Sequence, residues 1–386
     1  MNAKPLRFGI AGLGAVGGGV LRILQNHPVH LERRGGCPLV ISAVSGRDRS
    51  KDRGVSISAY AWEDDAIKLA SRDDVDIVVE LIGGDEGVAR TLVETALKNG
   101  KPVITANKAL LAKHGLALAQ LAEKNELPLC YEAAVGGGTP MIKMMREALT
   151  ANAILKFRGI LNGSTNFILS EIRDSGRSYD AVIAEAKEKG FLEADPSLDI
   201  DGHDAGHKLC ILGSIAFGIK PALDKLPRTG IGKIKLEDIQ NAESNGYRFK
   251  LVCWAERHEK GVVTLAVEAG LVPRDSIMAR VEKGKNILMV QGDSVGSSLC
   301  EGMGAGPGPT ASAVVADMVD IARGGRTDSV FGVAANDLLD GNFVSPEDVA
   351  GDFVVLRANE KPLVFSNQRR SEIQEQGKIF RLFSDI

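Results

Sequence analysis

The chain has 386 residues, 44% of them hydrophobic and 25% charged, and a chain of this length exceeds what a single hydrophobic core covers. Its 47 basic and 50 acidic residues are interspersed and give a formal charge of −3, which argues against nucleic acid or an anionic membrane as a partner and favours a small molecule. Five cysteines without Cys-x-x-Cys spacing predict neither a disulfide framework nor a zinc site, and with no signal-like or membrane-spanning run we expect a cytoplasmic protein.

The first 131 residues alternate short β-rich runs with helical stretches, a pattern typical of βαβ units on a parallel sheet. The expected strands cover residues 7–11, 39–45, 75–82, 102–105 and 127–131. A helix is expected from about Gly87 to Gly100, where Pro102 completes the usual stop signal. The sequence therefore predicts an α/β protein whose N-terminal domain is a Rossmann-like, doubly wound parallel sheet.

From about residue 152 the pattern changes to that of an α+β domain inserted after the dinucleotide fold, and we expect this domain to bind the substrate. The expected elements are a β-rich run over 154–169, helices between 178 and 218, strands at 262–268 and 286–291, a glycine-rich loop near 300, and a helix over 311–322 that returns to the first domain. The predicted domains are 1–135 completed by 305–325 for the dinucleotide, 136–304 for the substrate, and a C-terminal extension over 326–386.

A glycine fingerprint follows the first expected strand. Residues 12–17 read Gly12-Leu13-Gly14-Ala15-Val16-Gly17, and an apolar helical pattern begins at once. In this order the first glycine allows a tight turn, the second lets the backbone approach a pyrophosphate, and the third allows close helix packing. We expect Gly12, Gly14, Ala15, Val16 and Gly17 to bind a dinucleotide, and a merely structural turn is the alternative.

The second expected strand indicates which dinucleotide is preferred. It ends in Ser45-Gly46-Arg47, without the acidic residue that holds the ribose hydroxyls of NAD. Arg47 and the basic residues after it suit a 2′-phosphate, so NADP is predicted while NAD stays open. Asp48 and Asp52 leave the alternative of a solvated surface loop.

The densest group of carboxylates lies between residues 190 and 208. These acids are Glu193, Asp195, Asp199, Asp201 and Asp204. A calcium-binding EF-hand loop does not fit, because Lys208 would occupy its twelfth position, where a bidentate Glu is required. His203 and His207 have a spacing seen in zinc ligands, but no zinc motif frames them, so packing or surface roles are favoured. Asp204 and Lys208 share a helix face and can pair, as a surface ion pair or in a site.

This segment resembles the signature of homoserine dehydrogenases, Ala-x-x-x-Gly followed by Asp-Pro-x-x-Asp-Ile-x-Gly-x-Asp-x-x-x-Lys. The matching residues are Ala186, Gly190, Asp195, Pro196, Asp199, Ile200, Gly202, Asp204 and Lys208. Leu192 departs from the pattern. Further family-like segments extend the resemblance to about Arg323; they are Glu80–Gly84, Thr105–Leu110, Tyr131–Pro140, Leu161–Asn166 and Gly304–Gly306.

The resemblance implies reduction of L-aspartate 4-semialdehyde to L-homoserine by NAD(P)H, a step in threonine, methionine and isoleucine biosynthesis. Because hydride transfer turns the aldehyde oxygen into an alkoxide, the site needs a cation and a proton source. The resemblance implies Lys208 as the acid/base beside Asp204, and Lys108 near nicotinamide and substrate. The implied substrate-binding residues are Glu193, Asp199, Asp204, Gly163 and Ser164. The implied further cofactor positions are Gly84, Gly190 and Gly306.

The resemblance also implies a homodimer and a monovalent cation, sodium. The implied cation ligands are Glu132, Val135, Gly137 and Thr139, and the alternative is an ordinary loop at the domain junction. Many members carry a C-terminal regulatory ACT domain, but only 21 residues follow Phe365 here and most are polar. The tail is therefore predicted to be a truncated or diverged ACT-like segment or a packing extension, without strong threonine inhibition.

Two other functions stay open at this level. One is a related reductase acting on another small aldehyde or ketone, and the other is a non-catalytic NADPH-binding sensor. The presence of both Lys108 and Lys208 favours the enzyme.

Overall fold

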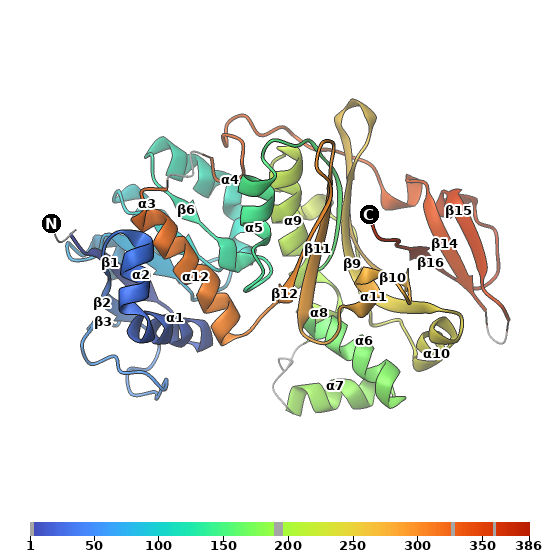
Figure 1. The fold of residues 1–386 in the computed structure, drawn as a ribbon, viewed down its shortest axis with the longest axis horizontal. Helices are drawn as coiled ribbons and strands as arrows, with labels where there is room; N and C mark the ends of the chain where they lie inside the picture. Colours follow the sequence, from blue (N-terminus) through green and yellow to red (C-terminus); the bar gives the residue numbers. More distant parts are fainter. Residues whose placement is uncertain (1–3, 189–195, 326–328, 358–359) are drawn as a thin grey trace. The chain divides into compact units, whose positions relative to one another are not determined.

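The computed structural model describes residues 4–188, 196–325, 329–357 and 360–386, and the chain divides into two compact units (Figure 1). Unit 1 comprises Met1–Thr150, Gly218–Pro221 and Ala305–Leu339; unit 2 comprises Ala151–Phe217, Ala222–Gly304 and Asp340–Ile386. The sequence placed the first boundary at residue 135, whereas the structure keeps residues 136–150 with unit 1. The predicted extension beyond 326 is shared between the two units.

Unit 1 is built on a six-stranded parallel sheet in the order β3-β2-β1-β4-β5-β6. The strands are β1 (Leu6–Ala11), β2 (Leu39–Ser45), β3 (Ala61–Glu63), β4 (Ile77–Glu80), β5 (Val103–Thr105) and β6 (Leu129–Cys130). The strand order reverses between β1 and β4, and ligands of such sheets bind outside the carboxyl ends of the strands at this switch point. The predicted Rossmann-like fold class is confirmed.

Helices complete unit 1. They are α1 (Ala15–Asn26), α2 (Pro28–Gly35), α3 (Val88–Lys98), α4 (Lys108–Lys124), α5 (Met141–Lys143) and α12 (Pro307–Ala322), with the 3-10 helices η1 (Ala66–Ser71) and η2 (Glu132–Ala134) and the π-helical turn η3 (Met144–Ala148). The predicted returning helix is α12, which places Ala311, Val314 and Met318 in one buried cluster with Phe8 and Ile10 of β1. A segment 300 residues away in sequence therefore completes the N-terminal core.

Unit 2 is built on a ten-stranded mixed sheet, with the path β12-β11-β7-β9-β10-β16-β14-β15 and with β8 and β13 also paired to β10. The strands are β7 (Ile154–Ile160), β8 (Arg228–Thr229), β9 (Tyr247–Arg257), β10 (Val262–Pro273), β11 (Lys285–Gly292), β12 (Gly296–Met303), β13 (Asn342–Phe343), β14 (Gly351–Leu356), β15 (Leu363–Gln368) and β16 (Lys378–Leu382). The predicted α+β insertion is confirmed, and β12 takes the place of the loop expected near residue 300.

The helices of unit 2 are α6 (Gly163–Ser175), α7 (Tyr179–Glu188), α8 (Ser197–Ile200), α9 (His203–Phe217), α10 (Leu236–Ser244) and α11 (Ile277–Arg280). The β-rich prediction for 154–169 is wrong beyond residue 160, because α6 begins at Gly163. Its start is fixed by Asn162, whose Oδ1 accepts the Thr165 N–H at 2.8 Å as a helix N-cap. Helix α9 packs against β9 and β10.

The tail is rich in β-strand. Strands β14, β15 and β16 are antiparallel neighbours, and β16 joins β10 through Leu271 and Leu382. The described residues between 340 and 386 otherwise hold the strand β13 and the single-turn helices η6 (Pro346–Asp348) and η7 (Arg370–Glu372). The tail therefore extends the sheet of unit 2.

Among the described residues, no helix combines the length and the apolar character needed to cross a membrane.

Candidate active site

The turn between β1 and α1 has the geometry of a dinucleotide fingerprint. Gly12 has a φ of 98°, and a Cβ there would lie 2.4 Å from the Leu81 carbonyl oxygen; a Cβ at Gly17 would lie 2.1 Å from the Gly12 carbonyl oxygen. Gly14 is the N-cap of α1 without a side-chain cap, and the space beside its α-carbon is open. The first backbone N–H groups of α1, including those of Ala15 and Val16, are thus suited to a phosphate.

A cavity of about 570 Å³ lies at this turn, and Gly12, Gly14 and Arg47 line it. Arg47 is exposed. Arg53 lines the same cavity but is held by backbone carbonyls: its Nε donates to Leu13 at 3.1 Å, and its two terminal nitrogens donate to Asp48 and Lys51. Of these two arginines, Arg47 is the one that can turn toward a ligand.

Glu80, at the carboxyl end of β4, holds the loop that follows this strand. Glu80 is fully buried, and its Oε1 accepts the N–H groups of Ile82 at 2.7 Å and Gly83 at 3.0 Å. Its Oε2 accepts the Thr105 hydroxyl at 2.6 Å. One carboxylate therefore joins the ends of β4 and β5, and it fixes the loop that contains Gly84.

Lys108 is the first residue of α4, directly beyond β5. The preceding Asn107 caps this helix by accepting the Leu110 N–H at 3.1 Å, and its Nδ2 donates to the Gly84 carbonyl at 2.6 Å. The two predicted cofactor positions Gly84 and Lys108 are thus held together through Asn107, at the sheet edge where ligands of this fold bind. Gly306, another predicted cofactor position, is the N-cap of α12 with a φ of 119°.

The predicted cation ligands lie around a buried carboxylate. Glu132 is 3% exposed; its two carboxylate oxygens accept the backbone N–H groups of Ile142 at 3.1 Å and Lys143 at 2.8 Å, and its own N–H donates to Asp317 at 3.0 Å. Burial raises the pKa of the Glu132 carboxyl, and the charge of Asp317 raises it further. The Thr139 hydroxyl oxygen is buried and has no hydrogen-bond partner among the described residues. This donor set of hard oxygens fits an alkali cation.

The predicted substrate and acid/base residues in unit 2 centre on Lys208. Helix α9 carries Asp204 and Lys208 one turn apart, and Lys208 is only 8% exposed. Its Nζ donates to Asp204 Oδ2 and to the Leu161 carbonyl, each at 2.7 Å. Lys208 is buried and the Asp204 side chain is only 13% exposed, so the pair is not an exposed surface ion pair.

Asn162 joins the two predicted substrate carboxylates. Its Nδ2 donates to Asp199 Oδ1 at 2.6 Å and to Asp204 Oδ2 at 2.8 Å. Burial raises the pKa of the Asp199 carboxyl, while hydrogen bonds from Asn162 and from Ser164 oppose that shift. Asp199, Asp204, Lys208, Ser164 and the adjacent Gly163 therefore come together around Asn162. The other two predicted residues of this region, Glu193 and Gly190, lie outside the described residues.

Comparisons with known proteins identify the family of this chain. A family model described as the NAD-binding domain of homoserine dehydrogenase matches residues 12–132, and one described as homoserine dehydrogenase matches residues 140–319. The chain is 45% identical over 320 residues to the homoserine dehydrogenase of Neisseria gonorrhoeae, across 83% of this chain and 73% of that protein. This chain belongs to the homoserine dehydrogenase family. The predicted oxidoreductase class and family are confirmed.

Other homoserine dehydrogenases match between 82% and 99% of this chain. That of Bacillus subtilis is 35% identical over 382 residues, across 98% of this chain and 87% of that protein. A crystal structure of a homoserine dehydrogenase from Thiobacillus denitrificans superposes with a TM-score of 0.89 at 36% identity and covers 99% of both chains. A hyperthermophilic archaeal homoserine dehydrogenase solved with NADPH matches with a TM-score of 0.70 at 26% identity, across 82% of this chain and 97% of that one. The NAD-binding family model and this NADPH complex support a nicotinamide cofactor for this chain.

Sequence reasoning missed the residues that orient the site. Glu80, Asn107 and Asn162 lay in segments that resembled the family, yet none was singled out. The sequence did contain a signal for these three residues. Each of them ends or follows a buried strand, where a polar side chain must find a hydrogen-bond partner. Which partner it finds depends on contacts between distant segments.

Proposed function

We propose that Lys208 is the proton donor when this chain reduces L-aspartate 4-semialdehyde to L-homoserine. Bound NADPH supplies the hydride to the aldehyde carbon, and the carbonyl oxygen then takes a proton, so that aldehyde, NADPH and one proton give alcohol and NADP⁺. The observation that carries the proposal is the buried Lys208, whose ammonium group is held by Asp204 and by the Leu161 carbonyl. A positioned acid of this kind contributes to the rate mainly at the transition state.

Asp204 keeps the Lys208 ammonium in place, and Asp199 offers a second carboxylate for the substrate ammonium. Gly163 and Ser164, at the start of α6, would contact the substrate carboxylate through the helix N-terminus. Glu193 completes the proposed set. Lys108, the first residue of α4, would stabilise the negative charge that develops on the carbonyl oxygen.

NADP is the proposed cofactor form, because Arg47 lines the dinucleotide cavity at the end of β2, where the ribose lies in this fold. Gly12, Gly14, Ala15, Val16 and Gly17 would hold the pyrophosphate. Gly84, Lys108, Gly190 and Gly306 would border the nicotinamide part.

Sodium is the proposed cation. Glu132 with Val135, Gly137 and Thr139 would hold it, and the unpartnered Thr139 hydroxyl supports this donor set. The cation would stiffen the loop after β6 and would take no part in the chemistry.

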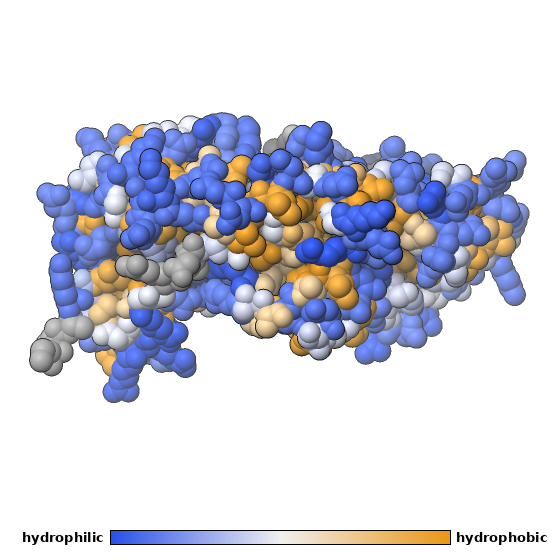
Figure 2. All heavy atoms as spheres, turned by 90° about the horizontal axis from the view of Figure 1, so that it is seen from above, coloured by the Kyte–Doolittle hydropathy of each residue, from blue (hydrophilic) through white to orange (hydrophobic). Residues whose placement is uncertain are grey.

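A homodimer in the cytoplasm is the proposed form. Figure 2 shows apolar areas within a largely polar face. Along the edge strand β12 and its hairpin, Val295, Leu299 and Met303 are each about half exposed, and such apolar exposure is typical of a subunit contact. Among the described residues no cysteine forms a disulfide, which suits a reducing compartment.

The decisive experiment compares wild type with Lys208→Met in a steady-state assay with aspartate semialdehyde, run with NADPH and with NADH. We expect kcat to fall by about 100-fold or more while NADPH binding, measured directly, stays near wild type. Near-normal turnover in the variant would reject Lys208 as the proton donor. If wild type reduced other small aldehydes but not aspartate semialdehyde, L-aspartate 4-semialdehyde would be rejected as the substrate.

A further inference from the structure

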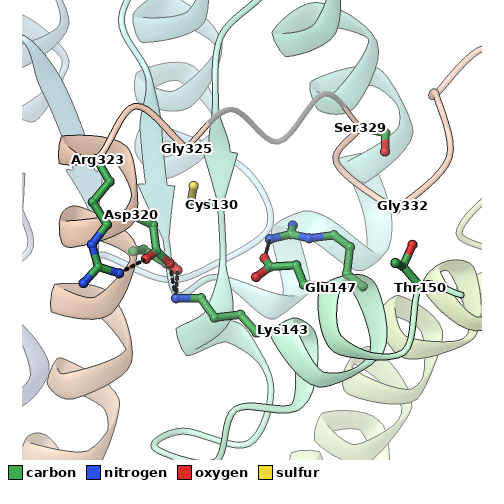
Figure 3. A pocket seen from close by; sticks show the side chains of 11 residues that line it. Cys130, Lys143, Glu147, Thr150, Asp320, Arg323, Gly325, Ser329 and Gly332 are labelled. Carbon is green, nitrogen blue, oxygen red and sulfur yellow. Dashed lines mark hydrogen bonds and ion pairs between the residues drawn. The ribbon is translucent and has the colours of Figure 1, made fainter. Parts of the chain in front are cut away.

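Unit 1 contains a second cavity, of about 420 Å³, which shares no lining residue with the dinucleotide cavity (Figure 3). It lies beside η3 and the end of α12. Three cationic side chains and three carboxylates line it; they are Lys143, Arg146, Arg323, Glu147, Asp317 and Asp320. A cavity with this many charges is suited to a polar ligand.

On one side of the cavity the charges neutralise one another. The Nζ of Lys143 contacts Asp320 and lies 3.5 Å from Asp317 Oδ1. Arg323 Nη1 lies 3.6 Å from Asp320 Oδ1. Figure 3 shows Lys143, Asp320 and Arg323 gathered together, with Glu147 and Thr150 across the cavity. This side offers no unsatisfied charge.

Arg146 differs from these residues. Its side chain is only 6% exposed, and its guanidinium lies 5.4 Å from the centre of the Tyr131 ring. Its Nη2 donates to Glu147 at 2.9 Å and its Nη1 to the Val330 carbonyl at 3.3 Å, but its Nε is buried without a partner among the described residues. A buried cationic N–H without an acceptor is costly, so this atom favours an incoming anion.

The geometry of the Arg146 guanidinium indicates which class of anion it would bind. The Nε and Nη2 of an arginine form one edge with two parallel N–H groups, which matches the two oxygens of a carboxylate. Glu147 already occupies the Nη2 half of that edge and is itself half exposed, so it can swing away into solvent. Glu147 is thus an internal competitor for the same edge.

We propose that this cavity is a binding site for a small carboxylate anion, held by the Nε–Nη2 edge of Arg146. Such a ligand replaces Glu147 as the partner of Nη2 and satisfies Nε. Since the cavity is separate from the dinucleotide cavity within unit 1, the ligand binds without competing with NADP.

The test uses the full chain with saturating NADP⁺, and measures the melting temperature as sodium acetate replaces sodium chloride at constant ionic strength. We expect a saturable rise for wild type. Arg146→Gln should weaken acetate binding about tenfold or more, because a charge-assisted pair is lost. Glu147→Gln should tighten it several-fold, because the competing carboxylate is gone. Arg33→Gln, an exposed arginine on α2, should bind acetate like wild type.

The two variants are expected to change the affinity for acetate in opposite directions. The proposal can therefore be rejected by Glu147→Gln alone, even if Arg146→Gln folds poorly. An unchanged or weakened acetate response in Glu147→Gln overturns it, as does a wild-type response in folded Arg146→Gln. Inorganic phosphate that binds more tightly than acetate, with the same dependence on Arg146, would overturn the carboxylate assignment.

Discussion

The side chains of Asn162 and Asp204, 42 residues apart in sequence, share a hydrogen bond of 2.8 Å, and the same Nδ2 of Asn162 reaches Asp199 at 2.6 Å. The carboxylate that holds Lys208 is therefore itself held by the residue that starts α6. Substitutions at Asn162 can separate its helix-capping role from its role in the site.

Asn162→Ser retains an oxygen that can cap α6 but lacks the amide donor. We expect the free energy of unfolding to fall by about 1–3 kcal/mol, because serine caps nearly as well as asparagine but cannot replace the amide hydrogen bonds to Asp199 and Asp204. Turnover should fall about 10-fold to 100-fold, since Asp199 and Asp204 both lose the hydrogen bond that positions them. Steady-state kinetics together with a denaturant titration measure both effects. A loss of stability without a loss of turnover would assign Asn162 to capping alone.

Arg47→Gln should weaken NADPH about tenfold or more and leave NADH nearly unchanged, because only NADPH presents a 2′-phosphate to the guanidinium. Arg53→Gln is the matched comparison. It should weaken both cofactors alike, because Arg53 ties the glycine turn to the following loop through the carbonyls of Leu13, Asp48 and Lys51. Direct binding titrations give the ratio of the two affinities. Equal effects of Arg47→Gln on both cofactors would make Arg47 an ordinary surface charge.

Glu80→Gln should lower the free energy of unfolding by about 2–3 kcal/mol, because a buried amide cannot replace all three hydrogen bonds that the carboxylate accepts. Thr105→Val removes one of those donors. The double variant should be less destabilised than the sum of the single ones, since the two side chains contact each other. Chemical denaturation of the four proteins provides this cycle, and strict additivity would contradict the coupling.

The buried Lys250 should make stability depend on alkaline pH. Its Nζ donates to Asn166 at 2.8 Å and to the Val281 carbonyl at 2.6 Å, and burial lowers its pKa to about 8. Glu282 opposes this shift, whereas Arg173 and Arg248 add to it. Between the folded pKa and the unfolded value of about 10.4, the unfolded chain binds more protons, so stability rises with pH.

Between pH 7.5 and 9.5 this group should add about 2 kcal/mol to the free energy of unfolding. Lys250→Met, which has no charge to titrate, should lack that increment when both proteins are unfolded with denaturant at the two pH values. If the free energies of unfolding of the two proteins changed equally with pH, burial would not destabilise the Lys250 ammonium group in the folded state.

The parallel sheet and its glycine turn could be predicted because their signals are local. Gly12 and Gly17 sit where no side chain fits, and strand and helix patterns alternate over short distances. The start of α6 was missed because the run after residue 154 is rich in β-forming residues, whereas the Asn162 cap decides the conformation there. The pairing of Asn162 with Asp199 and the tie from Glu80 to Thr105 join segments 37 and 25 residues apart, which no local pattern reveals.

The position of α12 in the core of unit 1 has a consequence for synthesis on the ribosome. The N-terminal sheet is complete once β6 has emerged, yet Ala311, Val314 and Met318 arrive only after the whole first part of unit 2 has been made. At ordinary translation rates of about 5–20 residues per second, that interval lasts on the order of ten seconds or more. During it, the nascent chain exposes an apolar surface that α12 later covers, which makes this stage the natural point for chaperone binding.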